Sequence, residues 1–216
     1  YVMTKIVFNN GTAPSKWDIT ASPGTLSSAT WTGSASEVVF SAASRSDFTT
    51  AAVTLAPLVT ISAAKYATYC SPHKLDFSKT DIKVYTAVSN GTTVQLTEVA
   101  DGIVPANEGV VLYCETADTY SIPATAASGS GDYSSNEMVG ITARTQVNAT
   151  DGGKTNYILA NEGGVVGFYK ASDGYLAANK AYLSTAKPAS ASAHGFLGFE
   201  ENTTAIGAIT NSKEIK

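Results

Sequence analysis

The apolar residues of this chain occur in short runs, some alternating with polar residues and some uninterrupted, and the spacing of an amphipathic helix is almost absent. Runs of this length that are bounded by Gly, Asn, Asp or Pro are typical of β-strands. The predicted strands are Val2–Asn9, Thr30–Gly33, Glu37–Ala42, Phe48–Leu55, Leu58–Ser62, Tyr66–Cys70, Ile82–Val88, Thr93–Val99, Val110–Cys114, Thr119–Ile122, Met138–Thr142, Asn156–Leu159, Val165–Tyr169, Lys180–Leu183 and Phe196–Phe199.

Asn-Gly and Asp-Gly pairs separate many of these runs, and they suit tight hairpins because they tolerate positive φ. The clearest hairpin is Ile82–Val99, which turns at Asn90-Gly91. Ala124–Ser135 is typical of an exposed loop, and helical turns are expected only at Pro72–Phe77 and Ala177–Lys180. Many short strands at this spacing predict an all-β fold, a β-sandwich or barrel-like modules with little helix.

A domain boundary is predicted near Ala56-Pro57. The residues before it are rich in Ser and Thr and hold both tryptophans, whereas Tyr replaces Trp after it. We therefore expect a small β-sandwich-like segment over residues 1–56 and a β-rich C-terminal module over residues 57–216. A segment of about 56 residues makes a marginal core by itself. It should pack on the second segment or belong to a larger domain whose remainder lies upstream.

The composition and net charge of the chain argue against some classes of binding partner. Hydrophobic residues fill 44% of the 216 positions, enough for a core, and charged residues only 15%, against roughly 25% in ordinary soluble domains. The net charge is −4 and the 14 Lys and Arg form no run, which argues against nucleic acid and an anionic membrane surface as partners. No uncharged apolar stretch approaches the roughly 18 residues of a membrane-spanning helix.

Four motifs follow one another along the second segment: VPANEGVVL at Val104–Leu112, YILAN at Tyr157–Asn161, GFYKA at Gly167–Ala171 and ANKAYL at Ala178–Leu183. This succession resembles a β-rich module of secreted and surface proteins of gut Bacteroidetes, a family without an assigned reaction. Trp31–Phe40 similarly resembles the closing strands of a β-sandwich found upstream of that module.

The resemblance implies a non-catalytic module that is secreted, periplasmic or on the outer cell surface. It would serve adhesion or support a neighbouring domain, with a glycan or a host or cell-surface protein as partner. The chain begins at Tyr1 with no visible signal peptide, which fits a mature secreted protein or a trimmed chain. The oligomeric state does not follow from the sequence.

Cys70 and Cys114 leave two alternatives open. As a disulfide they would close a loop of about 45 residues and add about 2–4 kcal/mol in an oxidising compartment. As free thiols they would be two small buried hydrophobes. A thiol nucleophile is disfavoured: only His73 and His194 could serve as its base, and Cys70 lies in a strand instead of at a helix N-terminus.

The sequence contains no pattern typical of a metal site or of a catalytic pair of carboxylates. Two histidines far apart make no zinc signature, and Asp151 and Asp173, each followed by Gly, read as turns in preference to calcium ligands. A glycosidase needs two facing carboxylates, whereas Glu200 and Glu201 are adjacent and would face opposite ways on a strand. No cofactor, metal or catalytic residue is therefore predicted, and a glycosidase is a remote alternative.

Aromatic residues are the remaining candidates for a ligand-binding role. An exposed Trp or Tyr offers a flat apolar face to a sugar ring, and the four that lie in or beside loops are Trp17, Trp31, Tyr133 and Tyr175. These four are the candidate ligand-binding residues. The first functional hypothesis is the non-catalytic surface module, and the alternative is a carbohydrate-binding module of a polysaccharide-utilisation system.

Overall fold

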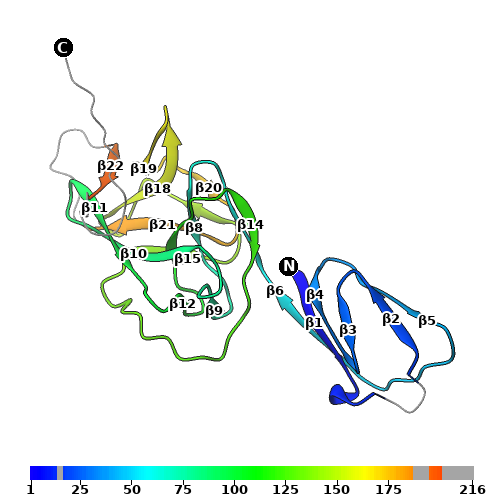
Figure 1. Ribbon diagram of the computed structural model, residues 1–216. Helices are drawn as coiled ribbons and strands as arrows, with labels where there is room; N and C mark the ends of the chain where they lie inside the picture. Colours follow the sequence, from blue (N-terminus) through cyan, green and yellow to red (C-terminus); the bar gives the residue numbers. More distant parts are fainter. Residues whose placement is uncertain (14–16, 187–194, 201–216) are drawn as a thin grey trace.

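The computed structural model describes residues 1–13, 17–186 and 195–200. These residues form an almost entirely β structure, in which the sole helical element is the 3₁₀ turn η1 (Asn9–Gly11). The prediction of an all-β fold with little helix is confirmed. Figure 1 shows two groups of strands that are joined by the chain that follows β6 (Ala51–Ala56). This chain passes through Pro57 into β7 (Leu58–Ile61).

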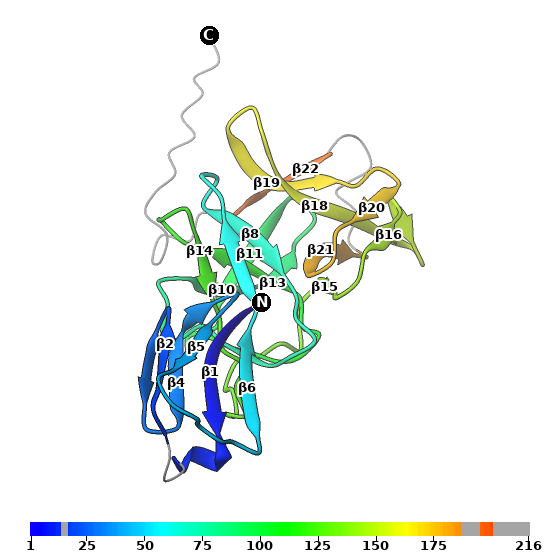
Figure 2. The ribbon, with the colours of Figure 1, turned by 90° about the vertical axis from the view of Figure 1, so that its right-hand side faces the viewer.

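The N-terminal group is a four-stranded sheet covered in part by a two-stranded ribbon. The sheet order is β3 (Thr25–Ser27), β4 (Thr30–Ala35), β1 (Val2–Phe8), β6, and the ribbon pairs β2 (Ile19–Ser22) with β5 (Val39–Ala42). Trp31, Ile6 and Phe8 form the centre of the small core between them. Figure 2 shows these strands side by side at the lower end of the molecule.

The strands at the edges of this small sandwich are unpaired on one side. Among the described strands, β2, β3, β5 and β6 each have one pairing partner. Large apolar side chains are exposed at Val39 in β5, at Val53 and Leu55 in β6, and at Phe48 before β6. Residues 48–58 contain no charge, although natural sheets commonly protect free edges with charged residues.

The C-terminal group is built on a ten-stranded, nearly closed sheet. Its order is β15-β21-β18-β19-β22-β11-β10-β13-β8, with β17 added beside β18. The bounds are β8 (Tyr66–Tyr69), β10 (Lys83–Ser89), β11 (Thr93–Glu98), β13 (Val110–Tyr113), β15 (Met138–Ile141), β17 (Thr150–Asp151), β18 (Lys154–Glu162), β19 (Val165–Lys170), β21 (Lys180–Thr185) and β22 (Phe196–Phe199).

Side-chain hydrogen bonds join β8, at one end of this sheet, to β21, the strand next to the other end. The backbone N–H of Ala181 in β21 donates to Oγ1 of Thr68 in β8 at 3.2 Å. Nδ2 of Asn179, just before β21, donates to the carbonyl of Cys70 at 3.0 Å. The sheet therefore curves into a barrel-like form whose seam lies between β8 and β21.

Alternation along the central strands gives this group two cores. Val84 and Leu112 point to one side, with Phe77 and Ile122. Tyr85 and Val111 point to the other side, together with Phe168 and Leu183. Because successive strand residues face opposite ways, strands β10 and β13 are buried on both faces, as the uninterrupted apolar run of β13 predicts.

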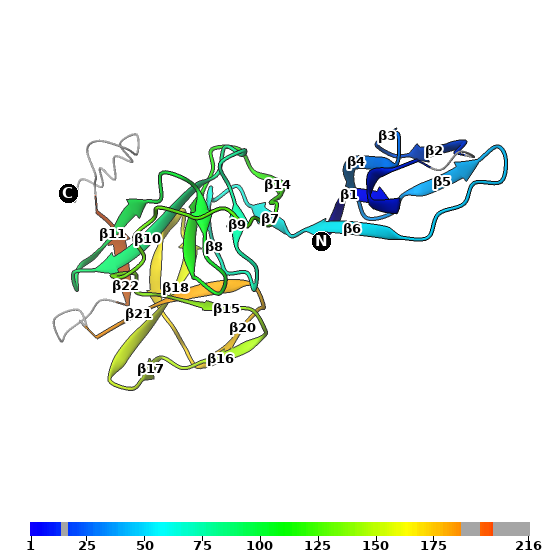
Figure 3. The same cartoon turned by 90° about the horizontal axis from the view of Figure 1, so that it is seen from below.

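Three short ribbons complete the structure. They pair β9 (Leu75–Asp76) with β12 (Ile103–Val104), β7 with β14 (Asp118–Ser121), and β16 (Thr145–Val147) with β20 (Gly174–Leu176). Figure 3 shows β7 and β14 near the junction with β6, and β16 and β20 on another side of the C-terminal group.

Each predicted strand overlaps an observed one, and the hairpin of β10 and β11 is confirmed. The predicted helical turns are wrong. Pro72–Phe77 contains strand β9, because the N–H groups of Asp76 and Phe77 donate to Pro123 and Gly102. Ala177–Lys180 holds a non-helical turn in which Asn179 has a φ of 59°.

Candidate functional site

Trp31 is buried, so its predicted role as an exposed platform is wrong. Its exposed fraction is 0%, and its Nε1 donates to the carbonyl of Pro23 at 2.8 Å. Gly24 and Gly33 pack against the indole so closely that a Cβ on Gly33 would lie 2.5 Å from the ring. The register explains the burial, because Trp31 is paired with Ile6 on the covered face of the sheet.

Trp17 and Tyr133 are half-buried and anchored. Trp17 packs on Phe8 with ring centroids 5.4 Å apart, and its Nε1 donates to the carbonyl of Ser28 at 2.9 Å. The Tyr133 hydroxyl donates to the carbonyl of Ile103 at 2.8 Å, and burial raises the pKa of this phenol. Both rings are therefore part of the packing.

Tyr175 is the candidate that lies open, with 60% of its surface exposed. It stands in the β16–β20 ribbon directly opposite Gln146. The neighbouring positions in β16 and β20, Val147 and Leu176, are buried or half-buried. Alternation therefore turns Tyr175 and Gln146 to the outside, because the intervening residues face the body of the module.

The same alternation places three further polar residues around Tyr175. Arg144 and Asn148 lie two positions to either side of Gln146, and Asp173 lies two positions before Tyr175. All five of these residues are exposed. We call this set the ribbon face: Arg144, Gln146, Asn148, Asp173 and Tyr175.

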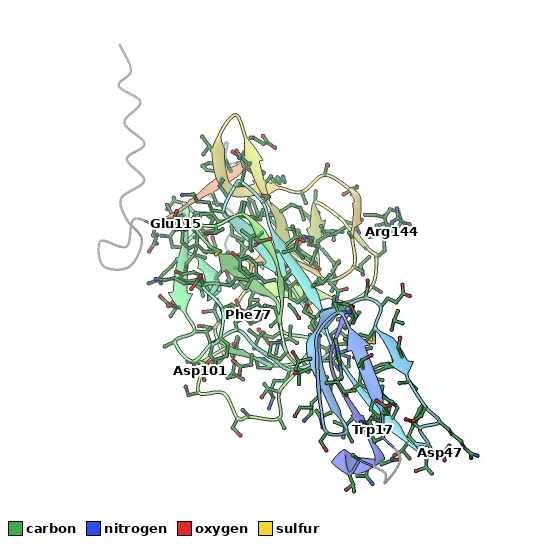
Figure 4. The ribbon with its side chains drawn as sticks, turned by 45° about the vertical axis from the view of Figure 1, so that its right-hand side comes forward. Trp17, Asp47, Phe77, Asp101, Glu115 and Arg144 are labelled. Carbon is green, nitrogen blue, oxygen red and sulfur yellow. The ribbon has the colours of Figure 1, made fainter. Side chains whose placement is uncertain are left out.

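Arg144 is held against the aromatic ring. Its Cζ lies 3.8 Å from the centroid of the Tyr175 ring, a cation–π contact. Among the described residues Arg144 has no ion pair, whereas the other arginine, Arg45, pairs with Asp47 at 3.1 Å. Figure 4 shows Arg144 projecting from the surface, well away from Trp17. No residue in the described part of the chain takes up the guanidinium N–H groups, which are therefore available there to an acceptor from outside.

The opposite end of the ribbon face is fixed by hydrogen bonds. Oδ1 of Asp173 accepts the backbone N–H of Ala149 at 2.8 Å. Nε2 of Gln146 donates to Oδ1 of Asn148 at 3.3 Å. The ribbon face thus offers a ring, a cation, two amides and a carboxylate on one surface, a set of groups suited to binding a polar ligand.

A second group of aromatic residues lies inside the barrel-like sheet. Tyr66 stacks on Phe199 with centroids 4.9 Å apart and packs against Tyr113 at 4.8 Å. The hydroxyls of Tyr66 and Tyr85 are buried and have no hydrogen-bond partner among the described residues. Burial, with a smaller contribution from Glu98, raises the pKa of Tyr85 to about 12. These phenols are neutral, closed off from solvent, and form core.

Cys70 and Cys114 are free and buried, so the disulfide alternative is wrong. They follow two paired strands, as a bond would require, but the register is unfavourable. Tyr69 is opposite Val110 and Tyr66 is opposite Tyr113, so the two cysteines lie at opposite ends of the strand pair. About five residues at 3.3 Å each separate them, well beyond the roughly 7 Å limit between Cα atoms.

The thiols are also unsuited to nucleophilic chemistry. Burial, and to a lesser extent Glu108, raises the pKa of Cys70 to about 11, so it stays protonated at neutral pH. His73 is exposed and has no contact with the Cys70 thiol among the described hydrogen bonds. His194 lies outside the described residues. The Cys114 sulfur instead lies 3.2 Å from the Tyr120 hydroxyl.

The carboxylates considered for metal or acid–base roles take part in a turn or in hydrogen bonds of the fold. Asp151 begins the two-glycine hairpin from β17 to β18, opposite Lys154. Glu200 accepts a hydrogen bond from Thr93 Oγ1 at 3.0 Å, and Glu201 lies outside the described residues. No group of three His, Cys, Asp or Glu side chains in the described ranges could hold a metal ion.

Two of the four motifs that carry the family resemblance, VPANEGVVL and ANKAYL, meet near Ser71 and Cys70. Asn107 takes a φ of 64° and its N–H donates to the carbonyl of Ser71 at 2.7 Å. A Cβ on Gly109 would lie 2.7 Å from the backbone N of Gly140, and Asn179 donates to the adjacent Cys70. Asn161, by contrast, lies inside β18 and not at a corner. The VPANEGVVL and ANKAYL motifs therefore serve close backbone packing.

No protein-family model matches the chain, no curated protein matches it, and no solved structure matches it. The resemblance to Bacteroidetes modules stays a prediction. Within the described part of the chain, no helix has the length and apolar character needed to cross a lipid bilayer.

Proposed function

We propose that this protein is a non-catalytic, exported binding module that recognises carbohydrate through the ribbon face. The observation that supports the proposal is the open Tyr175 ring, set among amide, guanidinium and carboxylate groups on one surface. One face of a pyranose ring carries mainly C–H groups and packs on an aromatic ring, while its hydroxyls need donors and acceptors around that ring. The ribbon face supplies both.

The proposal places the protein in the secreted, periplasmic or outer-surface compartment. Its support is the low content of charged residues and the motif resemblance. Soluble glycans and glycan-coated surfaces are abundant there, and a module that binds them needs no cofactor. The buried thiols of Cys70 and Cys114 are compatible with that setting because neither contacts solvent.

A glycan array read with three proteins tests this function. The wild-type protein should retain a subset of glycans, and Tyr175→Ala should lose them. Tyr1→Ala is the matched control, because Tyr1 is 58% exposed and lies in the N-terminal group. The proposal fails if the wild type retains no glycan or if Tyr175→Ala binds as the wild type does.

A second candidate function is adhesion to a protein or support of a neighbouring domain. It is favoured by the uncharged edge at β6, where Val53 and Leu55 are exposed. A Leu55→Lys variant separates the two functions. Adhesion through this edge requires that Leu55→Lys abolish attachment to a surface that the wild type coats, whereas glycan binding through the ribbon face requires that it leave glycan retention unchanged.

A further inference from the structure

The positions of the two charged side chains on the ribbon face indicate which class of saccharide the ribbon face would bind. Arg144 is opposite the position of Ala177 and Asp173 is opposite Asn148, because Thr145 pairs with Leu176 and Val147 with Gly174. The cation and the carboxylate therefore lie at opposite ends of the face, with Tyr175 between them. About four residues along a strand separate the two ends, on the order of 13 Å.

The cationic end is preorganised for an anion. The guanidinium carbon lies 3.8 Å from the centroid of the Tyr175 ring, and a guanidinium carries its N–H donors around the edge of its plane. None of these donors is taken by a side chain or carbonyl in the part of the chain that the structure describes. Stacking on Tyr175 restricts the side chain before a ligand arrives, so less conformational freedom is lost on binding.

The other end disfavours an anion and favours hydroxyls. Asp173 carries a negative charge, and one of its oxygens already accepts the N–H of Ala149. Its second oxygen and the Asn148 amide can accept and donate to sugar hydroxyls. An acidic group bound at this end would meet a like charge, so a bound saccharide would place its anion at Arg144.

We propose that the ligand is an acidic saccharide whose carboxylate binds Arg144 while its hydroxyls meet Asp173 and Asn148. This inference rests on the proposed function and names the class of glycan. A carboxylate is planar, and the guanidinium fork matches it with two parallel hydrogen bonds. Arg144 and Tyr175 thus act as one unit, in which one face of the ring positions the cation and the face away from Arg144 packs against the sugar.

The test uses pairs of probes in which one member carries free carboxylates and the other does not. Polygalacturonate is compared with its methyl ester, and sialyllactose with lactose, by titration calorimetry. Wild-type protein should bind the acidic member of at least one pair about ten-fold or more tightly, since charged hydrogen bonds are roughly twice as strong as neutral ones. Heparin and its desulfated form make a third arm, which shows whether sulfate replaces carboxylate.

Three variants assign the effect to Arg144. Arg144→Gln should bring the affinity for the acidic probe down to that of its neutral partner. Arg144→Lys keeps the charge but loses the fork and the stacking, and should fall between the two. Arg45→Gln, which removes the other arginine, should change nothing.

The outcomes separate the two proposals. The carboxylate inference is overturned if neutral glycans bind through Tyr175 and no acidic probe is preferred. It is also overturned if only the sulfated probe is preferred. In both cases the proposed function stands. If Arg144→Gln keeps the preference for acid, the assignment to Arg144 is overturned. If wild type binds no probe and retains nothing on the glycan array, both proposals fail.

Discussion

Trp31 and Tyr175 are equivalent candidates in the sequence and opposites in the structure. Each is an aromatic residue beside small polar residues and a turn, and each lies on a short strand. Trp31 faces the ribbon of β2 and β5 and is fully buried, whereas no described element covers the ribbon face around Tyr175. The comparison shows that a second layer decides whether an aromatic residue stabilises the fold or is free to bind.

The largest effect that tests this comparison is the loss of the buried indole. Trp31→Ala should lower the free energy of unfolding by about 3–5 kcal/mol, because it removes a large buried ring and leaves a cavity. Denaturant unfolding followed by circular dichroism measures the change. A loss below about 1 kcal/mol would contradict the assignment of Trp31 to the core.

Two glycine substitutions sharpen the comparison at the backbone. A Cβ on Gly33 would lie 2.5 Å from the Trp31 ring, so Gly33→Ala should destabilise by about 1–3 kcal/mol through overpacking. Gly174 lies beside Tyr175 in β20, and its Cβ would come no closer than 3.7 Å to the carbonyl of Ser172. Gly174→Ala should therefore stay within about 0.5 kcal/mol of the wild type. Equal effects at the two sites would remove the distinction between covered and uncovered faces.

Alkaline unfolding reports the buried tyrosines. The pKa of Tyr85 in the folded protein, about 12, lies above its ordinary value of 10.0. Between these two pH values the folded state keeps the Tyr85 proton, whereas the unfolded chain releases it. The contribution of the protonated Tyr85 to the free energy of unfolding is therefore complete below pH 10 and is lost as the pH rises to about 12. Tyr85→Phe, which removes an unpartnered hydroxyl, should make unfolding less dependent on pH in this window. An unchanged dependence would count against the burial of Tyr85.

The smallest predicted change concerns the cysteines. A thiol-specific reagent should find both thiols unreactive in the folded protein and two reactive thiols per chain in denaturant without reductant. Cys70 is protected by burial and by its raised pKa, and Cys114 by burial. Failure to find either thiol after unfolding would mean that the two are bonded, against the register of β8 and β13.

The strands could be predicted because their signal is local. A run such as Val110–Tyr113 is apolar at every position, and the glycines before and after neighbouring runs fix the turns. The short strands β16 and β20 were not predicted, because three residues each are too few for a periodic pattern. The alternation of Gln146 with Val147 and of Tyr175 with Leu176 is the faint signal that could have found them.

The site could be predicted only in part. Tyr175 was identified by its place near a turn, but its partner Arg144 is 31 positions away and carries no motif. Likewise, the burial of Trp31 depends on a ribbon that folds over from residues on both sides of it. The separation of Cys70 from Cys114 depends on strand register. Layer contacts and register are long-range properties, so a single sequence does not encode them in any short window.

The central claim is that Tyr175 binds a ligand without stabilising the fold. The most direct measurement is a titration of Tyr175→Ala with the glycan that the wild type retains best, on protein whose unfolding free energy is measured in the same buffer. We predict at least about a ten-fold loss of affinity, with stability within about 0.5 kcal/mol of the wild type. Wild-type affinity in this variant, or a loss of affinity that accompanies unfolding, would contradict the claim.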